Sequence, residues 1–296
     1  MKKSIAPPKL SIVTPSFNQG KYIEQTIQSV LSQGYPNLEY VIIDGGSTDN
    51  SVEIIRKYST SLKYWVSEPD NGQYDAINKG FHHCSGDLFA WINADDLYFP
   101  GSFSIITDIF TIYPQINWLT SLSHAFIDKN ARIIGAERSE GYNKNSFYLG
   151  RNGAAIPERG STYYIMQEAT FWRRSLWELA GGYINPDYNL AADFELWLRF
   201  WKHSILYCTD AQLSMFRFRS DQRSATYRAE YTKEARKALL LAGGKIHSRI
   251  KRRLFRLFSL LFSRIKIINT GKYFYPLVLY DNFVDDWFIK YDHFIY

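Results

Sequence analysis

LSIVTPSFNQGKYIEQTIQSVLSQGYPNLEYVIID, residues 10–44, places a helical pattern between two short apolar runs. The first run stops at Pro15, as expected of a short strand. Between the runs, apolar residues recur on one helical face at Ile23, Ile27, Val30 and Leu31. The second run is apolar at every position from 41 to 43, which is typical of a strand buried on both faces of a parallel sheet. The stretch therefore predicts a strand, a helix and a second strand in succession.

The same alternation continues through the first hundred residues. Strand patterns lie at residues 62–68 and 87–93, and helical patterns lie at residues 72–84 and 101–113. This alternation predicts an α/β fold, with a Rossmann-like, mostly parallel sheet flanked by helices. We expect this domain to span residues 1–225. A basic, amphipathic and aromatic-rich extension, largely helical, is expected over residues 226–296.

Polar residues follow three of the predicted strands, at the edge where ligands bind in such sheets. They are Thr14 to Ser16, Asp44 with its two following glycines, and Asn93 to Asp96. A carboxylate at Asp44 can accept hydrogen bonds from a base or a ribose, and the glycines allow a ligand to approach the backbone. Neither G-x-G-x-x-G nor G-x-x-x-x-G-K-[ST] follows the first strand, which argues against dinucleotide-binding and P-loop proteins.

Two adjacent carboxylates in WINADDLYFP, residues 91–100, directly follow a buried strand pattern. Like charges side by side are unfavourable unless a cation lies near them. Asp95 and Asp96 are therefore either metal ligands or caps of the helix that follows Pro100. The residues alone leave both interpretations open.

Five stretches resemble, in order and spacing, the inverting GT-A glycosyltransferases often called family 2. They are SIVTPSFNQGKYIEQTIQSVLSQGYPNLEYVIIDGGSTDNS, SEPDNGQYDAINKG, WINADDLYFPGS, QEATFWRRSLWELAGGY and AADFELWLR. The resemblance covers residues 10 to about 225. It implies a GT-A fold, a nucleotide-sugar donor, a Mg²⁺ or Mn²⁺ ion, and transfer with inversion at the anomeric carbon.

The resemblance also implies roles for individual residues. By matching position, the nucleotide pocket is formed by Thr14, Pro15, Ser16 and Asp44. Asp95 and Asp96 fall on the family's metal-binding aspartates. Either one could bind the metal directly while the other contacts the ribose. Asp193 falls on the catalytic base.

Chemistry independent of the resemblance supports a base of this kind. A single displacement needs one carboxylate to deprotonate the acceptor hydroxyl. Asp193 opens a helical pattern, and an acid there is also favoured by the helix dipole alone. The residues alone leave both a catalytic and a purely structural role of Asp193 open.

The sequence departs from the family pattern near the expected nucleotide. Asn93 stands where many members have an aspartate, and we expect it to hydrogen-bond the ribose or neighbouring groups. Asp75 is expected to make a nucleotide contact of a different kind. Arg219 replaces a frequent histidine, and nearby cations available to a diphosphate are Arg217 and Arg223.

The positive charge of the chain is concentrated near one end. Residues 245–266 carry eight Lys or Arg and no acid, so the remainder of the +6 chain carries +6 − 8 = −2. This distribution argues against nucleic acid as a partner. A basic amphipathic helix suits an anionic membrane surface, and the alternative is a helix docked on the catalytic domain.

Other features of the sequence set the expected location. With two cysteines, no apolar signal region before Pro7, and no apolar run of about 18 residues, we expect a cytoplasmic protein, peripheral on the inner face of the cell membrane. The 50 aromatic residues (22 Tyr, 20 Phe, 8 Trp) indicate either a large aromatic core or a carbohydrate-facing surface.

Together these features predict a metal-dependent glycosyltransferase of hexosyltransferase type. It would transfer a sugar to a hydroxyl of a glycan or lipid-linked acceptor, in polysaccharide biosynthesis. The alternatives are a non-catalytic nucleotide-sugar-binding relative and a sugar nucleotidyltransferase. The latter needs a glycine-rich loop bearing Arg or Lys after the first strand, and TPSFNQGKY lacks it.

Overall fold

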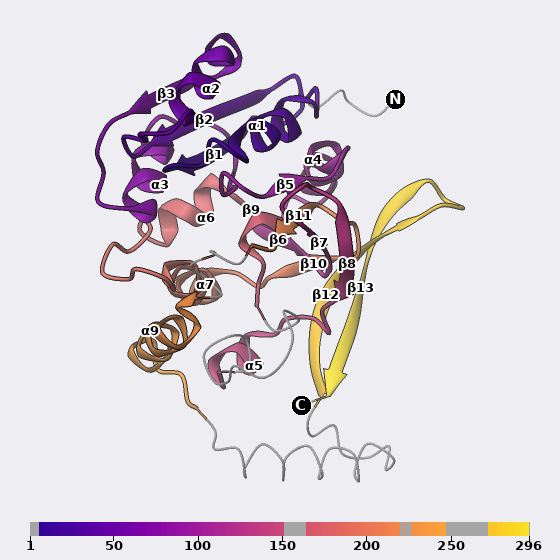
Figure 1. Ribbon diagram of the computed structural model, residues 1–296. Helices are drawn as coiled ribbons and strands as arrows, with labels where there is room; N and C mark the ends of the chain where they lie inside the picture. The colour runs from indigo at the N-terminus through magenta and orange to yellow at the C-terminus, as the bar shows by residue number, and fades with distance from the viewer. Residues whose placement is uncertain (1–5, 151–163, 220–221, 223–225, 247–271, 296) are drawn as a thin grey trace, which may run out of the picture.

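The computed structural model describes residues 6–150, 164–219, 222, 226–246 and 272–295 (Figure 1). The larger of its two sheets has nine strands in the order β13-β12-β10-β6-β9-β4-β1-β2-β3. Their bounds are β1 Leu10–Ser16, β2 Leu38–Asp44, β3 Tyr64–Ser67, β4 Leu88–Trp91, β6 Trp118–Ser121, β9 Thr170–Arg173, β10 Tyr207–Thr209, β12 Lys272–Asp281 and β13 Asp286–Ile295. The neighbours β3, β2, β1 and β4 are parallel, as are β6, β10 and β12, whereas β9 and β13 run antiparallel to their neighbours. The predicted mostly parallel α/β fold is confirmed.

Helices cover both faces of this sheet. Figure 1 shows α3, α6 and α7 on one side and α1 and α4 on the other. The described helices are α1 Ile23–Leu31, α2 Ser51–Lys57, α3 Gln73–His82, α4 Ser102–Ile112, α5 Lys144–Tyr148, α6 Arg174–Leu179, α7 Ala192–His203 and α9 Arg228–Leu241, with 3-10 turns η1 Ser59–Ser61 and η3 Gln167–Ala169. Neighbouring residues of β1 therefore enter different cores: Ile12 packs in one and Val13 in the other. Burial on both faces explains the continuous apolar runs of the sequence.

Much of the aromatic content lies in one of these cores. Five indole rings are almost inaccessible to solvent and pack with centroid distances of 5.0–6.0 Å; they belong to Trp91, Trp118, Trp172, Trp197 and Trp201. Contacts of this kind stabilise a core through burial and ring geometry. Of the two expectations for the aromatic residues, a large aromatic core is confirmed for these tryptophans.

A smaller four-stranded sheet lies beside the first, in the order β5-β11-β7-β8. Its strands are β5 Leu97–Tyr98, β7 Ser123–Ile127, β8 Ile133–Arg138 and β11 Ser214–Arg217. Strands β7 and β8 form an antiparallel hairpin, and β11 lies between β5 and β7. Because β5 follows β4 after only a few residues, this sheet brings the end of β11 to the end of β4.

The segment after residue 225 departs from a purely helical extension. Helix α9 is helical as expected, but residues 272–295 form strands β12 and β13, and β12 pairs in parallel with β10. Sequence reasoning did not predict these strands. Residues 247–266, most of the basic segment, lie outside the described residues. The domain boundary at 225 stays a prediction. No helix among the described residues has the length and hydropathy of a membrane span.

Candidate active site

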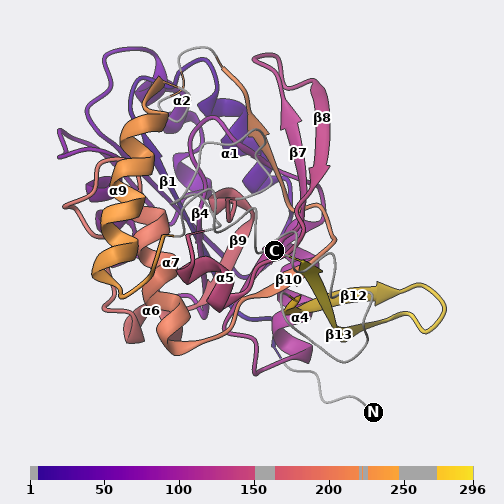
Figure 2. The same ribbon diagram turned by 90° about the horizontal axis from the view of Figure 1, so that it is seen from below.

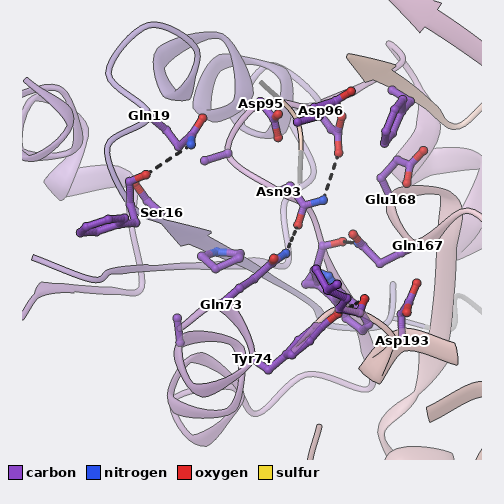
Figure 3. Close-up of a pocket in the computed structure, with 18 of the residues that line it drawn as sticks. Ser16, Gln19, Gln73, Tyr74, Asn93, Asp95, Asp96, Gln167, Glu168 and Asp193 are labelled. Atoms are coloured by element: carbon purple, nitrogen blue, oxygen red, sulfur yellow. Dashed lines mark hydrogen bonds between the residues drawn. The ribbon is translucent and has the colours of Figure 1, made fainter. Parts of the chain in front are cut away.

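A cavity of about 1090 Å³ opens at the carboxyl ends of β1 and β4. Its walls come from those strand ends, the start of α3, η3, the start of α7, the end of β11 and α9. Figure 3 shows labelled side chains from the strand ends and from α3, η3 and α7 around this space. Six of the predicted site residues line it: Pro15, Ser16, Asn93, Asp95, Asp96 and Asp193. Segments that are far apart in the chain, from Pro15 to Asp193, thus place their polar side chains around one space, as expected for an α/β sheet.

Asp44 is buried beneath the cavity rather than in its wall. Its carboxylate accepts hydrogen bonds from the hydroxyls of Ser16 (2.9 Å), Ser47 (2.6 Å) and Ser67 (2.7 Å), and from the Ser47 backbone N–H (2.8 Å). Four donors compensate the cost of burying this charge. Asp44 therefore acts on the cavity indirectly, because it fixes the hydroxyl of Ser16, a residue of the cavity wall.

Two other predicted residues have protein partners outside the cavity wall. Thr14 is fully buried, and its hydroxyl lies 3.0 Å from the hydroxyl of Tyr40. Asp75, in the first turn of α3, accepts a hydrogen bond from the Asn71 backbone N–H (3.0 Å) and lies 3.4 Å from Lys79 Nζ. Neither is among the described residues that line the cavity.

The Asp95–Asp96 turn is held from below by Arg217, the last residue of β11. The Arg217 backbone N–H donates to Asp96 Oδ1 (2.9 Å), and its Nε donates to the Asp95 carbonyl oxygen (2.6 Å). Its two remaining nitrogens donate to the Asp128 carbonyl oxygen (3.0 Å) and to Gln25 Oε1 (2.7 Å). Arg217 is fully buried, so its guanidinium supports the turn instead of facing a ligand. Arg223 lies outside the described residues.

The second oxygen of Asp96 belongs to an amide chain along the cavity floor. Asn93 Nδ2 donates to Asp96 Oδ2 (3.3 Å), and Gln73 Nε2 donates to Asn93 Oδ1 (2.7 Å), as Figure 3 shows. Both carboxylate oxygens of Asp96 are therefore engaged by protein donors. Gln73, the first residue of α3, was not predicted as a site residue. It could have been found from its stretch GQYDAINKG, which resembles the glycosyltransferase family.

Asp95 and Arg219 form a charged pair in the cavity wall. Arg219 Nε lies 3.3 Å from Asp95 Oδ2, and both side chains are about 13% exposed. Arg219 Nη1 also donates to Gln19 Oε1 (3.1 Å), and its guanidinium lies over the ring of Tyr22 at 4.8 Å. The pair presents one anionic and one cationic group side by side, which suits a cation together with a phosphate.

Asp193 lies in the first turn of α7 and faces the same cavity. The Phe194 backbone N–H donates to its Oδ1 (2.7 Å), and the Tyr231 hydroxyl donates to the same oxygen (3.4 Å). Burial disfavours the charged carboxylate and raises the pKa of Asp193 to about 6, although these two hydrogen bonds act in the opposite direction. A carboxylate with such a pKa is ionised at neutral pH and still basic enough to accept a proton.

Glu168, in η3, is another acidic residue in the cavity wall. It is 4% exposed, and burial, reinforced by the nearby charges of Asp95 and Asp193, raises its pKa to about 7. Burial and the charges of Asp95 and Glu168 also raise the pKa of Asp96. Its neighbour Gln167 is buried in the same wall.

The cavity fits a divalent cation bound together with a ligand's phosphates. Among the described residues, no group of three or more His, Cys, Asp or Glu side chains has the arrangement of a metal site. Mg²⁺ is usually held by only one or two carboxylates, completed by phosphate oxygens and water. Asp95 fits this role best, because both oxygens of Asp96 already accept hydrogen bonds.

Comparison with known proteins identifies the family of the chain. Residues 11–179 match the model of the family described as Glycosyl transferase family 2. An uncharacterized glycosyltransferase of Mycobacterium tuberculosis is 31% identical over 196 residues, which are 65% of this chain and 68% of the relative. One from Haemophilus influenzae is 26% identical over 234 residues, 78% of this chain and 72% of the relative.

Solved structures share the fold at lower identity. TarS 1-349 of S. aureus in complex with UDP-GlcNAc superposes with a TM-score of 0.60 at 15% identity, covering 88% of this chain and 76% of that fragment. The chain spans 46% of the longer TarS chain. The mannosyltransferase PcManGT of Pyrobaculum calidifontis, in complex with GDP-Man and Mn²⁺, superposes with a TM-score of 0.52 at 16% identity. The superposition covers 88% of this chain and 83% of that one.

Proposed function

The chain belongs to glycosyl transferase family 2 and is a glycosyltransferase, and from this premise we propose that it transfers a sugar from a nucleotide-sugar donor to an acceptor hydroxyl with inversion. The observation that carries the proposal is the arrangement of Asp95 and Asp193 around one cavity. Inversion by single displacement needs a diphosphate leaving group on one side of the anomeric carbon and a base on the other.

The donor half of the proposed site is built from the ends of β1 and β4. Pro15 and Ser16 line the nucleotide side, with Asp44 fixing the Ser16 hydroxyl from below. Asn93 is held by Gln73 and supplies amide groups near the expected ribose. Arg219 provides positive charge for the diphosphate next to Asp95.

Asp95 is the proposed protein ligand of a Mg²⁺ or Mn²⁺ ion. When bound, the ion neutralises the negative charge that develops on the nucleoside diphosphate as it leaves. The bound Mn²⁺ of PcManGT supports this proposal by analogy of fold. Asp96 has a different task, because its hydrogen bonds to Arg217 and Asn93 fix the turn that carries Asp95.

Asp193 is the proposed general base. In its ionised form it accepts the proton of the acceptor hydroxyl as that oxygen attacks the anomeric carbon. Its raised pKa, about 6, strengthens it as a base without neutralising it at pH 7. Glu168, with a pKa of about 7, is well placed to exchange hydrogen bonds with a sugar hydroxyl from the same wall.

The proposed acceptor is a glycan or a lipid-linked glycan at an anionic membrane surface. Support comes from the eight Lys and Arg of residues 245–266. Flotation of the full-length protein with vesicles containing anionic lipid tests binding to an anionic membrane surface. The wild type is expected to float with the vesicles, and the double variant R252E/R253E to float less. Equal flotation on neutral and anionic vesicles would reject the membrane proposal.

A donor screen tests the activity itself. The wild type is incubated with UDP-, GDP- and dTDP-sugars, with Mn²⁺, with Mg²⁺ or with EDTA, and release of the nucleoside diphosphate is measured. We expect metal-dependent release with one donor class, and NMR of the transferred sugar should show an inverted anomeric configuration. Donor binding without any turnover would instead identify a non-catalytic relative.

A further inference from the structure

Helix α9, which lies beside α7 (Figure 2), holds the loop that leads into α7 and the candidate base. A single carboxylate oxygen, Glu234 Oε2, accepts hydrogen bonds from the backbone N–H groups of Asn189 (3.1 Å), Leu190 (2.9 Å) and Ala191 (3.0 Å). Ala191 is the residue directly before α7, which has no cap from a side chain of its own. Glu234 therefore accepts from the N-cap N–H of α7 from another helix, as the carboxylate of a capping box does locally.

The same loop is also held by a second helix, α3. The Tyr74 hydroxyl, on α3, donates to the Leu190 carbonyl oxygen (2.6 Å). The backbone of residue 190 is therefore fixed through both its N–H and its C=O, by helices that lie far apart in the chain. Asp193 follows three residues later, so the position of its carboxylate depends on this attachment.

One turn before Glu234, α9 also contacts the base directly. Tyr231 lines the cavity and donates its hydroxyl to Asp193 Oδ1 (3.4 Å), while its ring packs edge-on against Tyr164 (5.6 Å). Burial and the neighbouring Asp193 raise the pKa of Tyr231 well above its usual value, so the hydroxyl keeps its proton and remains a donor. The other titratable groups facing this pair are Glu168, Glu234, Tyr74 and Tyr164.

We propose that α9 is the positioning element of the active site, with Glu234 fixing the loop before Asp193 and Tyr231 orienting its carboxylate. The inference rests on the proposed role of Asp193 as base. It goes beyond the family match, which ends at residue 179, and assigns a catalytic purpose to a helix about forty residues after α7 begins. Neither residue acts on the substrate in this proposal; both act through Asp193.

The Glu234 part is tested by kinetics with a matched control on the same helix. Glu234→Ala is expected to lower kcat about tenfold or more, because small misplacements of a catalytic group are costly, while the donor KM stays within about twofold of the wild type. Glu234→Gln, which keeps one acceptor oxygen, should recover part of the loss. Glu230→Gln, an exposed acid one turn earlier, should behave as wild type. Unchanged kcat in Glu234→Ala would overturn this role.

The Tyr231 part is tested by the pH profile of kcat/KM. Tyr231→Phe removes a donor to the ionised carboxylate, so the acid limb should move to higher pH by about one unit, in line with the worth of a hydrogen bond to a charged group. Tyr227→Phe, exposed at the start of α9, should leave the limb in place. An unmoved limb in Tyr231→Phe would overturn the role of this hydroxyl.

These outcomes are separable from failure of the proposed function. If the wild type transfers no sugar, or if Asp193→Asn transfers as well as the wild type, the role of Asp193 fails first. If Asp193→Asn is inactive while Glu234→Ala and Tyr231→Phe behave as wild type, only the inference about α9 fails. Circular-dichroism melting of each variant gives the folded fraction at the assay temperature. If Glu234→Ala does not fold, a fall in kcat for Glu234→Gln at unchanged donor KM supports the Glu234 role, and unchanged kcat overturns it.

Discussion

Two aspartates of the same domain, the fully buried Asp44 and the partly buried Asp193, have opposite surroundings. Asp44, at the end of β2, accepts four hydrogen bonds from three serines and is fully buried. Asp193, at the start of α7, has one backbone donor and one distant hydroxyl, and burial raises its pKa to about 6. A buried carboxylate with many hydrogen-bond donors contributes to the stability of the fold, whereas one with few donors is available for proton transfer. The number of donors, more than burial itself, distinguishes the two.

The largest expected effect concerns the rate of transfer. Asp193→Asn removes the proposed base and should lower kcat by roughly 10²–10⁴-fold, the usual contribution of general base catalysis. The measurement is release of nucleoside diphosphate at saturating donor and acceptor. Asp187→Asn, in the exposed loop before α7, is the control, and a loss there of similar size would remove the contrast between the two aspartates.

The same substitution should make the protein more stable at neutral pH. The folded pKa of Asp193, about 6, lies above its ordinary value of 3.8, so its folded form binds a proton more tightly than the unfolded chain does. This contribution is fully present below about pH 4 and is lost as pH rises through 6. At pH 8, Asp193→Asn should therefore raise the free energy of unfolding by up to about 3 kcal/mol. Urea denaturation at pH 4 and pH 8 tests this; a gain that is equal at both pH values contradicts it.

Asp44→Asn should show the reverse pattern. An amide replaces one acceptor oxygen with a donor, which then faces donors of Ser47 and Ser67, and a buried donor left without an acceptor costs about 1–3 kcal/mol. The free energy of unfolding should fall by this amount, while kcat per folded molecule changes little. A large rise in donor KM without loss of stability would show that Asp44 contacts the nucleotide directly.

The smallest effect is expected in the wild type itself. Because the base must be ionised, kcat/KM should fall about tenfold per pH unit below pH 6 and level off above it. At pH 5 the loss is therefore about tenfold. A profile that continues flat to pH 5 would contradict the raised pKa of Asp193 as the controlling ionisation.

The sequence was most informative where the chain supplies a local pattern. Apolar runs followed by polar residues predicted the strand ends, and their convergence at one sheet edge brought Ser16, Asn93 and Asp95 to one cavity. The aspartate of AADFELWLR faces the same cavity because α7 begins there. Each of these residues is placed by its own strand or helix.

Residues that act through tertiary contacts were not predictable in the same way. Glu234 and Tyr231 lie on a helix without a recognisable motif, and their partners are about forty residues earlier. Arg217 was assigned to a diphosphate because it is cationic, whereas the sheet β5-β11-β7-β8 turns it into a buried support. Strands β12 and β13 were missed because their aromatic-rich sequence, with Pro276 in its middle, alternates poorly.

The pairing of β12 with β10 has a consequence for the way the chain matures on the ribosome. Cys208 pairs with Leu277, which is synthesised 277 − 208 = 69 residues later. At ordinary elongation rates of 5–20 residues per second, the edge of β10 waits on the order of 3–14 s for its neighbour. An apolar strand edge left open for that time is a template for association with other nascent chains. Crowded polysomes are thus where we expect this enzyme to depend most on chaperones, well before donor or acceptor is encountered.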